Sequence, residues 1–294
     1  MTVLVVTGAN GNLGRRLLKD ARVRGGGRAL VRRESAVPPL KQDNADLDVR
    51  VVDYLDAGAL TSALEGATSV VHLVGILKES STSRYERAHQ RTTEMLIESA
   101  ARAGVGRILN LSIIGSDPNS NNACLRSKGA TDAMLLEGAV DATVARVPMV
   151  LGEGDYAAAS LHARASKPVN WLLRAESLEQ PLYAGDVVTA VLRMLKDAAF
   201  SNRIVELAGP EVLSRAELTR RGAAVLGNQT RVRSLPLGIG MAVAAVLERL
   251  PDPPLTRAML GVLDHDDDVD VSAVVAELGL KLMPLDEALR RCIG

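Results

Sequence analysis

A glycine-rich turn close to the N-terminus limits the folds open to this chain more than any other part of the sequence. An apolar run at residues 3–7 leads into the turn, and a helical pattern at residues 12–23 follows it. Gly8 permits a tight turn, Gly11 lets the backbone approach a phosphate, and Gly14 lets the helix pack closely on the strand. The amides at the helix start then face a pyrophosphate, where the helix dipole favours negative charge. This junction predicts dinucleotide contacts from Gly8, Asn10, Gly11, Asn12, Leu13 and Gly14.

Strand-like apolar runs alternate with helical patterns through the first half of the chain. The helical patterns cover residues 12–23, 85–103 and 124–137. Strands that alternate with helices form a parallel sheet with helices on both faces, and continuously apolar runs fit a sheet buried on both faces. We therefore predict an α/β fold built on a Rossmann-type doubly wound parallel sheet. Its strands would be residues 3–7, 28–32, 48–52, 69–74, 107–112 and 142–147.

After about residue 150 the alternation loosens. We predict an NADP(H)-binding domain over residues 1–150 and a smaller α+β region over residues 151–294, on the substrate or partner side and partly packed back on the sheet. The acidic run 264–270 lacks the glycine and ligand spacing of a calcium loop, so it is interpreted as a solvated loop. The apolar segment 237–250 could line a substrate pocket, contact a membrane surface or pack in the core. Because it has no rich basic flank for lipid headgroups, we expect it to pack in the core. Helices are predicted at 184–196, 214–226, 237–250 and 284–292, and strands at 203–207 and 230–234.

Charge and composition exclude several classes of protein. The 35 basic and 35 acidic residues cancel, which argues against a dedicated nucleic-acid binder, and aromatic residues are too few for a base-stacking surface. Cys124 and Cys292 are the only cysteines, so a disulfide framework is excluded and a reducing, cytoplasmic location is expected. The longest uncharged apolar stretch, residues 235–247, is shorter than the ~18 residues that a membrane span needs. The histidines show no metal-ligand spacing, and we expect no metal.

The residues after the second predicted strand bear on the choice of cofactor. Proteins selective for NAD usually place an acidic residue there, about 20 residues after the turn, to bind the ribose 2′-hydroxyl. This chain has Arg32 and Arg33 at that point. A guanidinium suits a 2′-phosphate and can stack on adenine, so we predict NADP(H) in preference to NAD(H). The alternative is a pair of solvated arginines in a loop.

The glycine turn and three later segments together resemble a known protein family. The three segments are residues 70–77 (Val-Val-His-Leu-Val-Gly-Ile-Leu), 146–152 (Arg-Val-Pro-Met-Val-Leu-Gly) and 253–256 (Pro-Pro-Leu-Thr). Together with Thr-Gly-x-x-Gly-x-x-Gly, they resemble the extended and atypical short-chain dehydrogenases/reductases. The resemblance is to the branch related to the nucleotide-binding accessory subunit of mitochondrial complex I, with the NmrA-like proteins as neighbours. It covers most of the chain and is strongest over residues 1–150.

The resemblance implies further cofactor contacts. Asp53, followed by Tyr54, matches the position that hydrogen-bonds the adenine amino group. Lys128 matches the lysine that bridges the nicotinamide ribose hydroxyls. A turn-forming Asp53 and a surface Lys128 are the structural alternatives. The wall under the adenosine ribose would consist of Leu73, Val74 and Gly75.

The resemblance also locates the positions where catalysis would occur, and two of them depart from the family pattern. Active members carry Tyr-x-x-x-Lys on the helix after the fifth strand, with both side chains on one helix face. Four residues before Lys128 this chain has Cys124. A supporting Ser or Thr is replaced by Ile113, and Ser112 matches the preceding serine, which is more often structural. The sequence therefore predicts no certain catalytic group.

These departures leave three functions open. The first is an NAD(P)(H)-binding protein without standard dehydrogenase turnover, acting as a redox sensor or as an assembly or accessory protein with a protein partner. The second is an NADPH-dependent oxidoreductase on a small hydrophobic carbonyl or quinone substrate, for which the cofactor supplies the hydride. The third and weaker is a sugar-nucleotide epimerase or dehydratase, which depends on the missing tyrosine.

Overall fold

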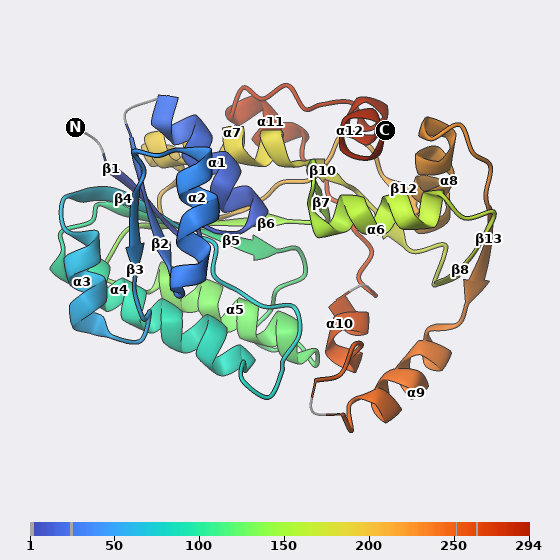
Figure 1. Ribbon diagram of the computed structural model, residues 1–294, viewed down its shortest axis with the longest axis horizontal. Coiled ribbons are helices and arrows are strands. Elements are labelled where there is room, and N and C mark those ends of the chain that lie inside the picture. The colour runs from blue at the N-terminus through green and yellow to red at the C-terminus, as the bar shows by residue number, and fades with distance from the viewer. Residues whose placement is uncertain (1–2, 24–25, 251, 263) are drawn as a thin grey trace. The chain divides into compact units, whose positions relative to one another are not determined.

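The apolar runs of the first half form one sheet in the computed structural model (Figure 1). Over the residues that the structure describes, 3–23, 26–250, 252–262 and 264–294, this sheet has seven strands in the order β11-β6-β5-β4-β1-β2-β3. β1 pairs in parallel with β2 and β4, and the order is that of a doubly wound sheet, so the predicted fold class is confirmed. The strands are β1 (Val3–Thr7), β2 (Gly27–Val31), β3 (Asp48–Val51), β4 (Ala67–His72), β5 (Arg107–Ile113), β6 (Ala142–Val147) and β11 (Arg203–Glu206).

Contacts divide the chain into two units. The first contains residues 1–76, 83–146 and 188–205, and the second contains residues 77–82, 147–187 and 206–294. Each unit is therefore built from more than one stretch of chain. Helix α7 (Ala184–Lys196) contributes residues to both.

Helices cover both faces of the sheet in the first unit. Helices α3, α4 and α5 pack side by side on one face, and α1 and α2 lie on the other (Figure 1). A π-helical turn, η2 (Glu86–Arg91), leads directly into α4. Strand residues such as Val5, Leu30 and Val70 have no exposed surface, which is the burial expected of strands covered on both faces. The helices are α1 (Asn12–Val23), α2 (Val37–Asp43), α3 (Ala57–Leu64), α4 (Thr92–Arg102) and α5 (Ala123–Leu136), with 3₁₀ turns η1 (Glu34–Ala36) and η3 (Ala198–Phe200).

The second unit is built around three helices, α6 (Tyr156–Ala165), α8 (Arg215–Val225) and α12 (Leu285–Ile293). Their shared core is apolar, and its leucines from all three helices are fully buried. Short strands pair around it: β7 (Val150–Leu151) with β10 (Leu182–Tyr183), β9 (Leu178–Glu179) with β12 (Leu213–Ser214), and β8 (Val169–Leu173) with β13 (Arg231–Leu235). The unit also contains α9 (Leu237–Leu247), α10 (Arg257–Val262) and α11 (Ser272–Glu277).

Helix α9 corrects one expectation from the sequence. Its small residues Gly240 and Ala244 are buried, whereas Ile239, Val243 and Val246 are 51%, 49% and 59% exposed. The prediction that this apolar segment packs in the core is therefore wrong for these three side chains. In the described ranges, no helix combines the length and apolar character needed to cross a membrane.

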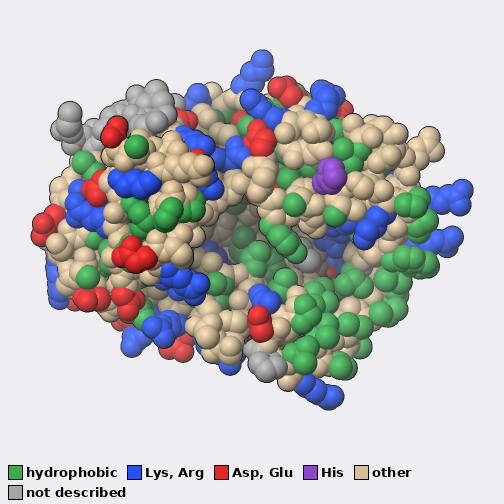
Figure 2. Space-filling view, in the orientation of Figure 1, with side chains coloured by type: hydrophobic (Ala, Val, Ile, Leu, Met, Phe, Trp, Pro, Cys, Tyr) green, Lys and Arg blue, Asp and Glu red, His purple; other side chains and the backbone are tan. Residues whose placement is uncertain are grey.

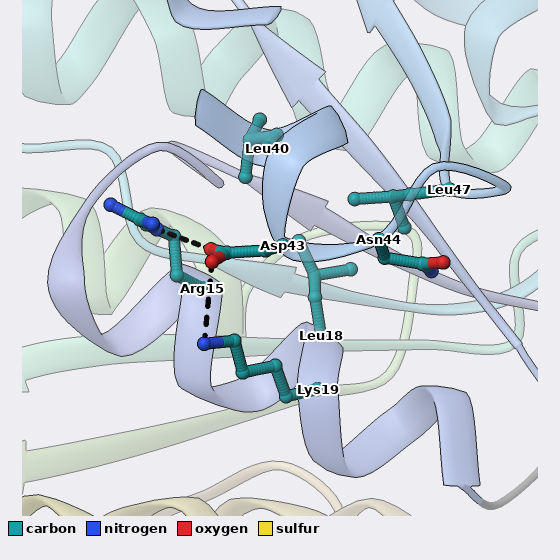
Figure 3. A pocket seen from close by; sticks show the side chains of 7 residues that line it. All are labelled: Arg15, Leu18, Lys19, Leu40, Asp43, Asn44 and Leu47. Carbon is teal, nitrogen blue, oxygen red and sulfur yellow. Dashed lines mark hydrogen bonds and ion pairs between the residues drawn. The ribbon is translucent and has the colours of Figure 1, made fainter. Parts of the chain in front are cut away.

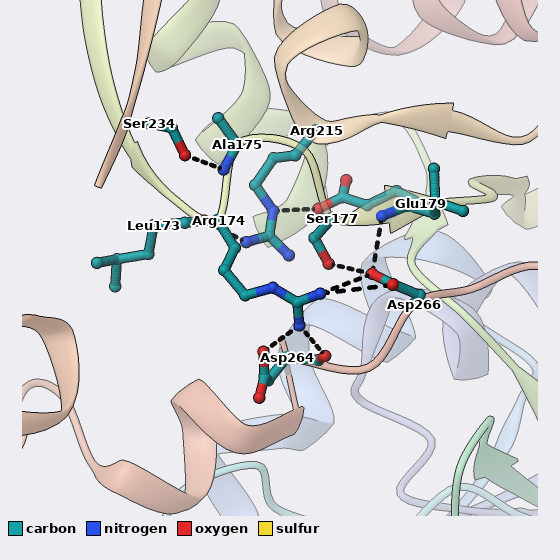
Figure 4. Close-up of polar contacts among 10 residues, drawn as sticks. Leu173, Arg174, Ala175, Ser177, Glu179, Arg215, Ser234, Asp264 and Asp266 are labelled. Carbon is teal, nitrogen blue, oxygen red and sulfur yellow. Dashed lines mark hydrogen bonds and ion pairs between the residues drawn. The ribbon is translucent and has the colours of Figure 1, made fainter. Parts of the chain in front are cut away.

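The acidic run after α10 is partly tied to the second unit by ionic contacts (Figure 4). The guanidinium of Arg174 binds both Asp264 and Asp266. Asp266 also accepts hydrogen bonds from the Ser177 hydroxyl at 2.7 Å and from the Leu178 amide at 3.0 Å. The run is therefore an anchored segment, and only part of it is a solvated loop.

Asp267, the next residue, makes the stability of this unit depend on pH. Burial, with repulsion from Glu179, raises the pKa of Asp267 to about 7. The unfolded chain releases this proton near pH 4, so the folded state loses stability as the pH rises from about 4 through 7. Asp267→Asn should gain stability over the natural protein by on the order of 1–2 kcal/mol between pH 5 and pH 8.

Urea denaturation of both proteins at several pH values measures this difference. Asp268→Asn is the matched control, because Asp268 is an exposed neighbour. A gain of Asp267→Asn that stays constant with pH would contradict the assignment.

Candidate functional site

The glycine turn opens on a cavity of about 570 Å³ in the first unit. The cavity lies at the carboxyl ends of β1, β2 and β4, which is where doubly wound sheets bind their ligands. Its walls combine backbone from the turn, exposed arginines and a strip of apolar side chains. They are formed by Gly8, Asn10, Gly11, Arg15, Arg32, Arg33, Ser35, Ala36, Pro39, Leu40, Tyr54, Leu73, Val74 and Gly75.

The turn can take its shape only with glycine at two positions. Gly8 has a φ of 67°, and a Cβ there would lie 3.0 Å from the Leu73 carbonyl carbon. A Cβ on Gly14 would lie 2.7 Å from the Ala9 carbonyl oxygen. The first glycine therefore lets the turn lie against the backbone that follows β4, and the second lets α1 start close to the turn. This cradle fits the pyrophosphate of a dinucleotide.

Tyr54 holds this turn from inside the protein. Its hydroxyl donates to the Leu30 carbonyl oxygen at 2.6 Å and accepts from the Gly8 amide at 3.0 Å. Burial raises the pKa of Tyr54 to about 12, so the phenol keeps the proton that it donates. Tyr54 is thus one of the residues that line the cavity, and its hydroxyl positions the turn.

The arginines give one end of the cavity a positive charge. Arg32 and Arg33 are exposed and follow β2, as predicted, and Ser35 adds a hydroxyl beside them. Arg15 also lines the cavity from α1, and Asp43 of α2 holds its Nε at 2.6 Å. Figure 3 shows this carboxylate between Arg15 and Lys19, in a small pocket that joins α1 to α2. Sequence reasoning missed Arg15 and Ser35.

Five of the predicted cofactor residues do not line this cavity, namely Asn12, Leu13, Gly14, Asp53 and Lys128. Asn12 lies in the first turn of α1, where its side chain accepts from Arg16 Nε at 2.6 Å. Leu13 and Gly14 lie in the same turn. Asp53 is exposed, and its carboxylate accepts from the Leu55 amide at 3.1 Å, which is the turn-forming alternative. Contacts of these residues with the cofactor remain predictions.

Cys124 stands on α5 at the position of the usual catalytic tyrosine and has no exposed surface. Its Sγ lies 3.9 Å from the Ile76 carbonyl oxygen. Burial raises the pKa of the thiol, although nearby Lys128 and a hydrogen bond with Tyr85 act in the opposite direction. The thiol therefore stays protonated, buried and weakly nucleophilic near neutral pH.

Lys128 is buried next to the cavity, so the surface alternative is wrong. Its Nζ donates to the Leu111 carbonyl oxygen at 3.4 Å. A Cβ on Gly75 would lie 3.1 Å from the same Nζ, and Gly75 lines the cavity. Burial lowers the pKa of Lys128, while Asp132 and Cys124 favour its charged form. The ammonium thus lies beside the cavity wall at Gly75, and its contact with a cofactor remains a prediction.

Ser112 is engaged in an internal polar network. Its hydroxyl donates to the Asp132 carboxylate at 3.0 Å and lies 3.3 Å from the Ser116 hydroxyl. Asp132 in turn accepts from Arg146 Nε at 3.0 Å. These bonds join α5 to β5 and β6, which is the structural role that the sequence predicts for Ser112.

His89 is a site neighbour that the sequence did not reveal. Its Nε2 accepts from the Ile76 amide at 3.0 Å, and its Nδ1 lies 3.1 Å from the Ser127 hydroxyl. Burial lowers the pKa of His89 to about 3, so the ring is neutral. His72 is buried, and its Nδ1 lies 2.8 Å from the Thr7 hydroxyl, so it is a core histidine with a hydrogen-bond partner.

Comparison with known families agrees with this geometry. A family model described as NAD(P)H-binding matches residues 8–167. The chain is 26% identical over 296 residues to the mitochondrial NADH dehydrogenase (ubiquinone) 1 alpha subcomplex subunit 9 of Arabidopsis thaliana, covering 97% of this chain and 73% of that protein. It is 27% identical to a ceramide reductase of Caulobacter vibrioides, covering 94% of this chain and 88% of that protein.

A solved structure shares the fold. It is an NADPH-dependent quinone oxidoreductase of Escherichia coli in complex with NADPH, with a TM-score of 0.74 and 22% sequence identity. The similarity covers 97% of this chain and 98% of the other. At this level of identity the match speaks for the fold alone.

Proposed function

Because this chain belongs to the NAD(P)H-binding family, as an atypical short-chain dehydrogenase/reductase, we propose that it binds NADP(H) and does not turn the cofactor over by the tyrosine mechanism. The single observation that carries the choice of cofactor is the pair Arg32 and Arg33 in the wall of the cavity. Two guanidinium groups at the end of β2 suit the 2′-phosphate of NADP(H), which NAD(H) lacks. An acidic residue, which would select NAD(H), does not occupy either position.

The residues present would hold the cofactor along the cavity. The turn at Gly8 would receive the pyrophosphate, the arginines the 2′-phosphate, and Lys128 the nicotinamide ribose. NADPH, when bound, supplies a hydride to an acceptor. Such a transfer also requires a proton at the acceptor, and the family takes this proton from the tyrosine that Cys124 replaces. A buried thiol with a raised pKa is a poor substitute in reach and in acidity.

A role through a partner protein fits these features. The relative in Arabidopsis thaliana is by its name a subunit of a larger assembly. We propose that this chain likewise acts as a redox sensor or accessory protein, with its cofactor as a bound ligand. Neither Cys124 nor Cys292 is in a disulfide, which suits a reducing compartment such as the cytoplasm.

The retained lysine favours one alternative. Lys128 lies beside Gly75, where it would orient a nicotinamide ribose for reaction. The ceramide reductase and the quinone oxidoreductase act on hydrophobic molecules by their names. The alternative is therefore an NADPH-dependent reductase of a hydrophobic carbonyl or quinone.

A measurement of NADPH oxidation by the purified protein distinguishes the accessory role from the reductase. We expect no steady oxidation that depends on added quinone or carbonyl compounds, because Cys124 stands where active members carry the proton-donating tyrosine. Sustained turnover by the natural protein would contradict the proposal. Cys124→Ala then identifies the proton donor, with Cys292→Ala as the matched control. Turnover lost only in Cys124→Ala would assign the thiol as the acid.

A further inference from the structure

Helix α9 and the strand next to it present a continuous apolar surface. Large side chains on α9 recur at helical spacing on its outward side, and Leu250 follows just after the helix end. The exposed Trp171 on β8 extends this surface. We call it the α9 patch, and it consists of Trp171 (59% exposed), Ile239, Val243, Val246 and Leu250 (51% exposed). Figure 2 shows hydrophobic side chains gathered over the region that α9 and α10 occupy in Figure 1.

Packing within the second unit explains why these side chains point outward. Gly240 faces the protein, and a Cβ there would lie 2.4 Å from Leu173 of β8 and 3.2 Å from Leu260 of α10. The two buried positions of α9 are therefore the small residues Gly240 and Ala244, while Ile239, Val243 and Val246 remain outside. Leu173 and Trp171 are two residues apart on one strand and lie on the same face of it. Trp171 is thus on the side of β8 that α9 covers.

Arginines border the α9 patch. Arg231 and Arg233 are exposed and pair in register with Val169 and Trp171. The Arg233 guanidinium lies 5.5 Å from the centre of the Trp171 ring. Arg249, at the far end of α9, is also exposed. The surface therefore combines three turns of uncharged apolar helix with cations and a tryptophan at its edge.

The acidic residues close to α9 are balanced by cations. Glu248 binds Arg257 Nε at 2.8 Å, and Asp252 lies 3.2 Å from Lys78 Nζ. Their negative charge is compensated locally. The border of the patch is consequently electropositive, which complements an anionic surface.

We propose that the α9 patch docks on the anionic surface of a lipid bilayer, with α9 lying in the interface. Apolar side chains would enter the acyl boundary while Trp171 and the arginines remain among the headgroups. A protein partner usually offers hydrogen bonds across an interface, at about one per 100–200 Å². The outward side of α9 has no side chain that can form one from residue 237 to residue 247. This inference concerns the second unit and does not depend on the proposed function.

Vesicle flotation of the full chain tests the proposal. Vesicles of phosphatidylcholine alone are compared with vesicles that contain phosphatidylglycerol. We expect binding only to the anionic vesicles, and a loss of about tenfold in Val243→Glu, because the change places a charge in the acyl boundary. Arg231→Gln and Arg233→Gln should each weaken binding about fivefold. Ile204→Glu and Arg87→Gln are matched controls on exposed residues outside the patch.

The other outcomes each overturn the proposal. Equal binding to both kinds of vesicle would remove the role of charge. Absence of vesicle binding, with a dimer in sedimentation that Val243→Glu dissociates, would make the occupant a second copy of this chain. If the protein neither bound vesicles nor formed a dimer, the α9 patch would be a docking site for neither a membrane nor a second copy. NADPH titration of every variant checks folding, because the patch shares no residue with the cavity.

Discussion

Replacing Arg32 and Arg33 together with alanine is expected to weaken NADPH binding by roughly a hundredfold, while NADH binding changes by less than about threefold. Both side chains line the cavity and are exposed, so the 2′-phosphate would be the group they meet in water. Charge-assisted hydrogen bonds to such a phosphate stabilise a complex by about 1.5–3 kcal/mol each before screening. Calorimetric titration of both variants with both cofactors measures the difference.

Salt and a matched variant make the result specific. The NADPH preference should shrink at high ionic strength, since exposed charges are screened beyond about one Debye length. Arg87→Ala with Arg91→Ala removes the same charge from η2, outside the cavity, and should leave the preference intact. Equal losses for NADPH and NADH would mean that the arginines bind the pyrophosphate instead, and the proposed selectivity would be wrong.

Gly129→Ala is expected to destabilise the first unit by about 2–4 kcal/mol. Gly129 lies on α5 next to Lys128, and a Cβ there would lie 2.3 Å from both the Asp117 carbonyl carbon and the Pro118 nitrogen. These are backbone atoms, so the clash can be relieved only by moving α5 away from the loop after β5. That movement would also displace Lys128, and NADPH affinity should fall with stability. Urea denaturation and NADPH titration measure the two effects.

The control substitution should have the opposite sign. Gly58 lies on α3, is exposed, and a Cβ there would meet only Asp56 Oδ1, at 3.4 Å. Alanine favours helix over glycine by about 1 kcal/mol, so Gly58→Ala should stabilise the protein slightly. If Gly129→Ala behaved like Gly58→Ala, the close approach of α5 to the loop would not be needed for the fold.

Much of the sheet was predictable from the sequence because its strands are buried on both faces. Each of the six predicted strands starts and ends within two residues of its place in the structure. Helices α2 and α3 were missed, because they are short and α2 carries Pro38 and Pro39 in its first turn. Residues that α2 brings to the cavity, such as Pro39, were lost with it. Because this one short helix was not predicted, part of the cavity wall could not be predicted either.

The rest of the site depends on pairings that no local pattern encodes. Arg15 reaches the cavity wall, and Asp43, 28 positions later, is the residue that holds its guanidinium. His89 meets Ser127 across 38 positions. The apolar composition of α9 predicts that the helix packs against an apolar surface. It does not show which residues of the helix face the protein and which face outward. Lys128 is buried because α5 lies close to the loop after β5. In the sequence, the only sign of this close approach is the glycine at position 129.

The hydroxyl of Tyr54 has a consequence for how quickly the protein can respond to its cofactor. It ties the amide of Gly8 to the carbonyl of Leu30, so the turn is already fixed by the protein's own bonds. A preorganised turn loses little conformational entropy when a ligand arrives. Occupancy should then follow the free concentration of the dinucleotide directly, with no slow rearrangement between arrival and capture. For a protein that reports on a cellular redox pool, such immediacy would matter more than affinity.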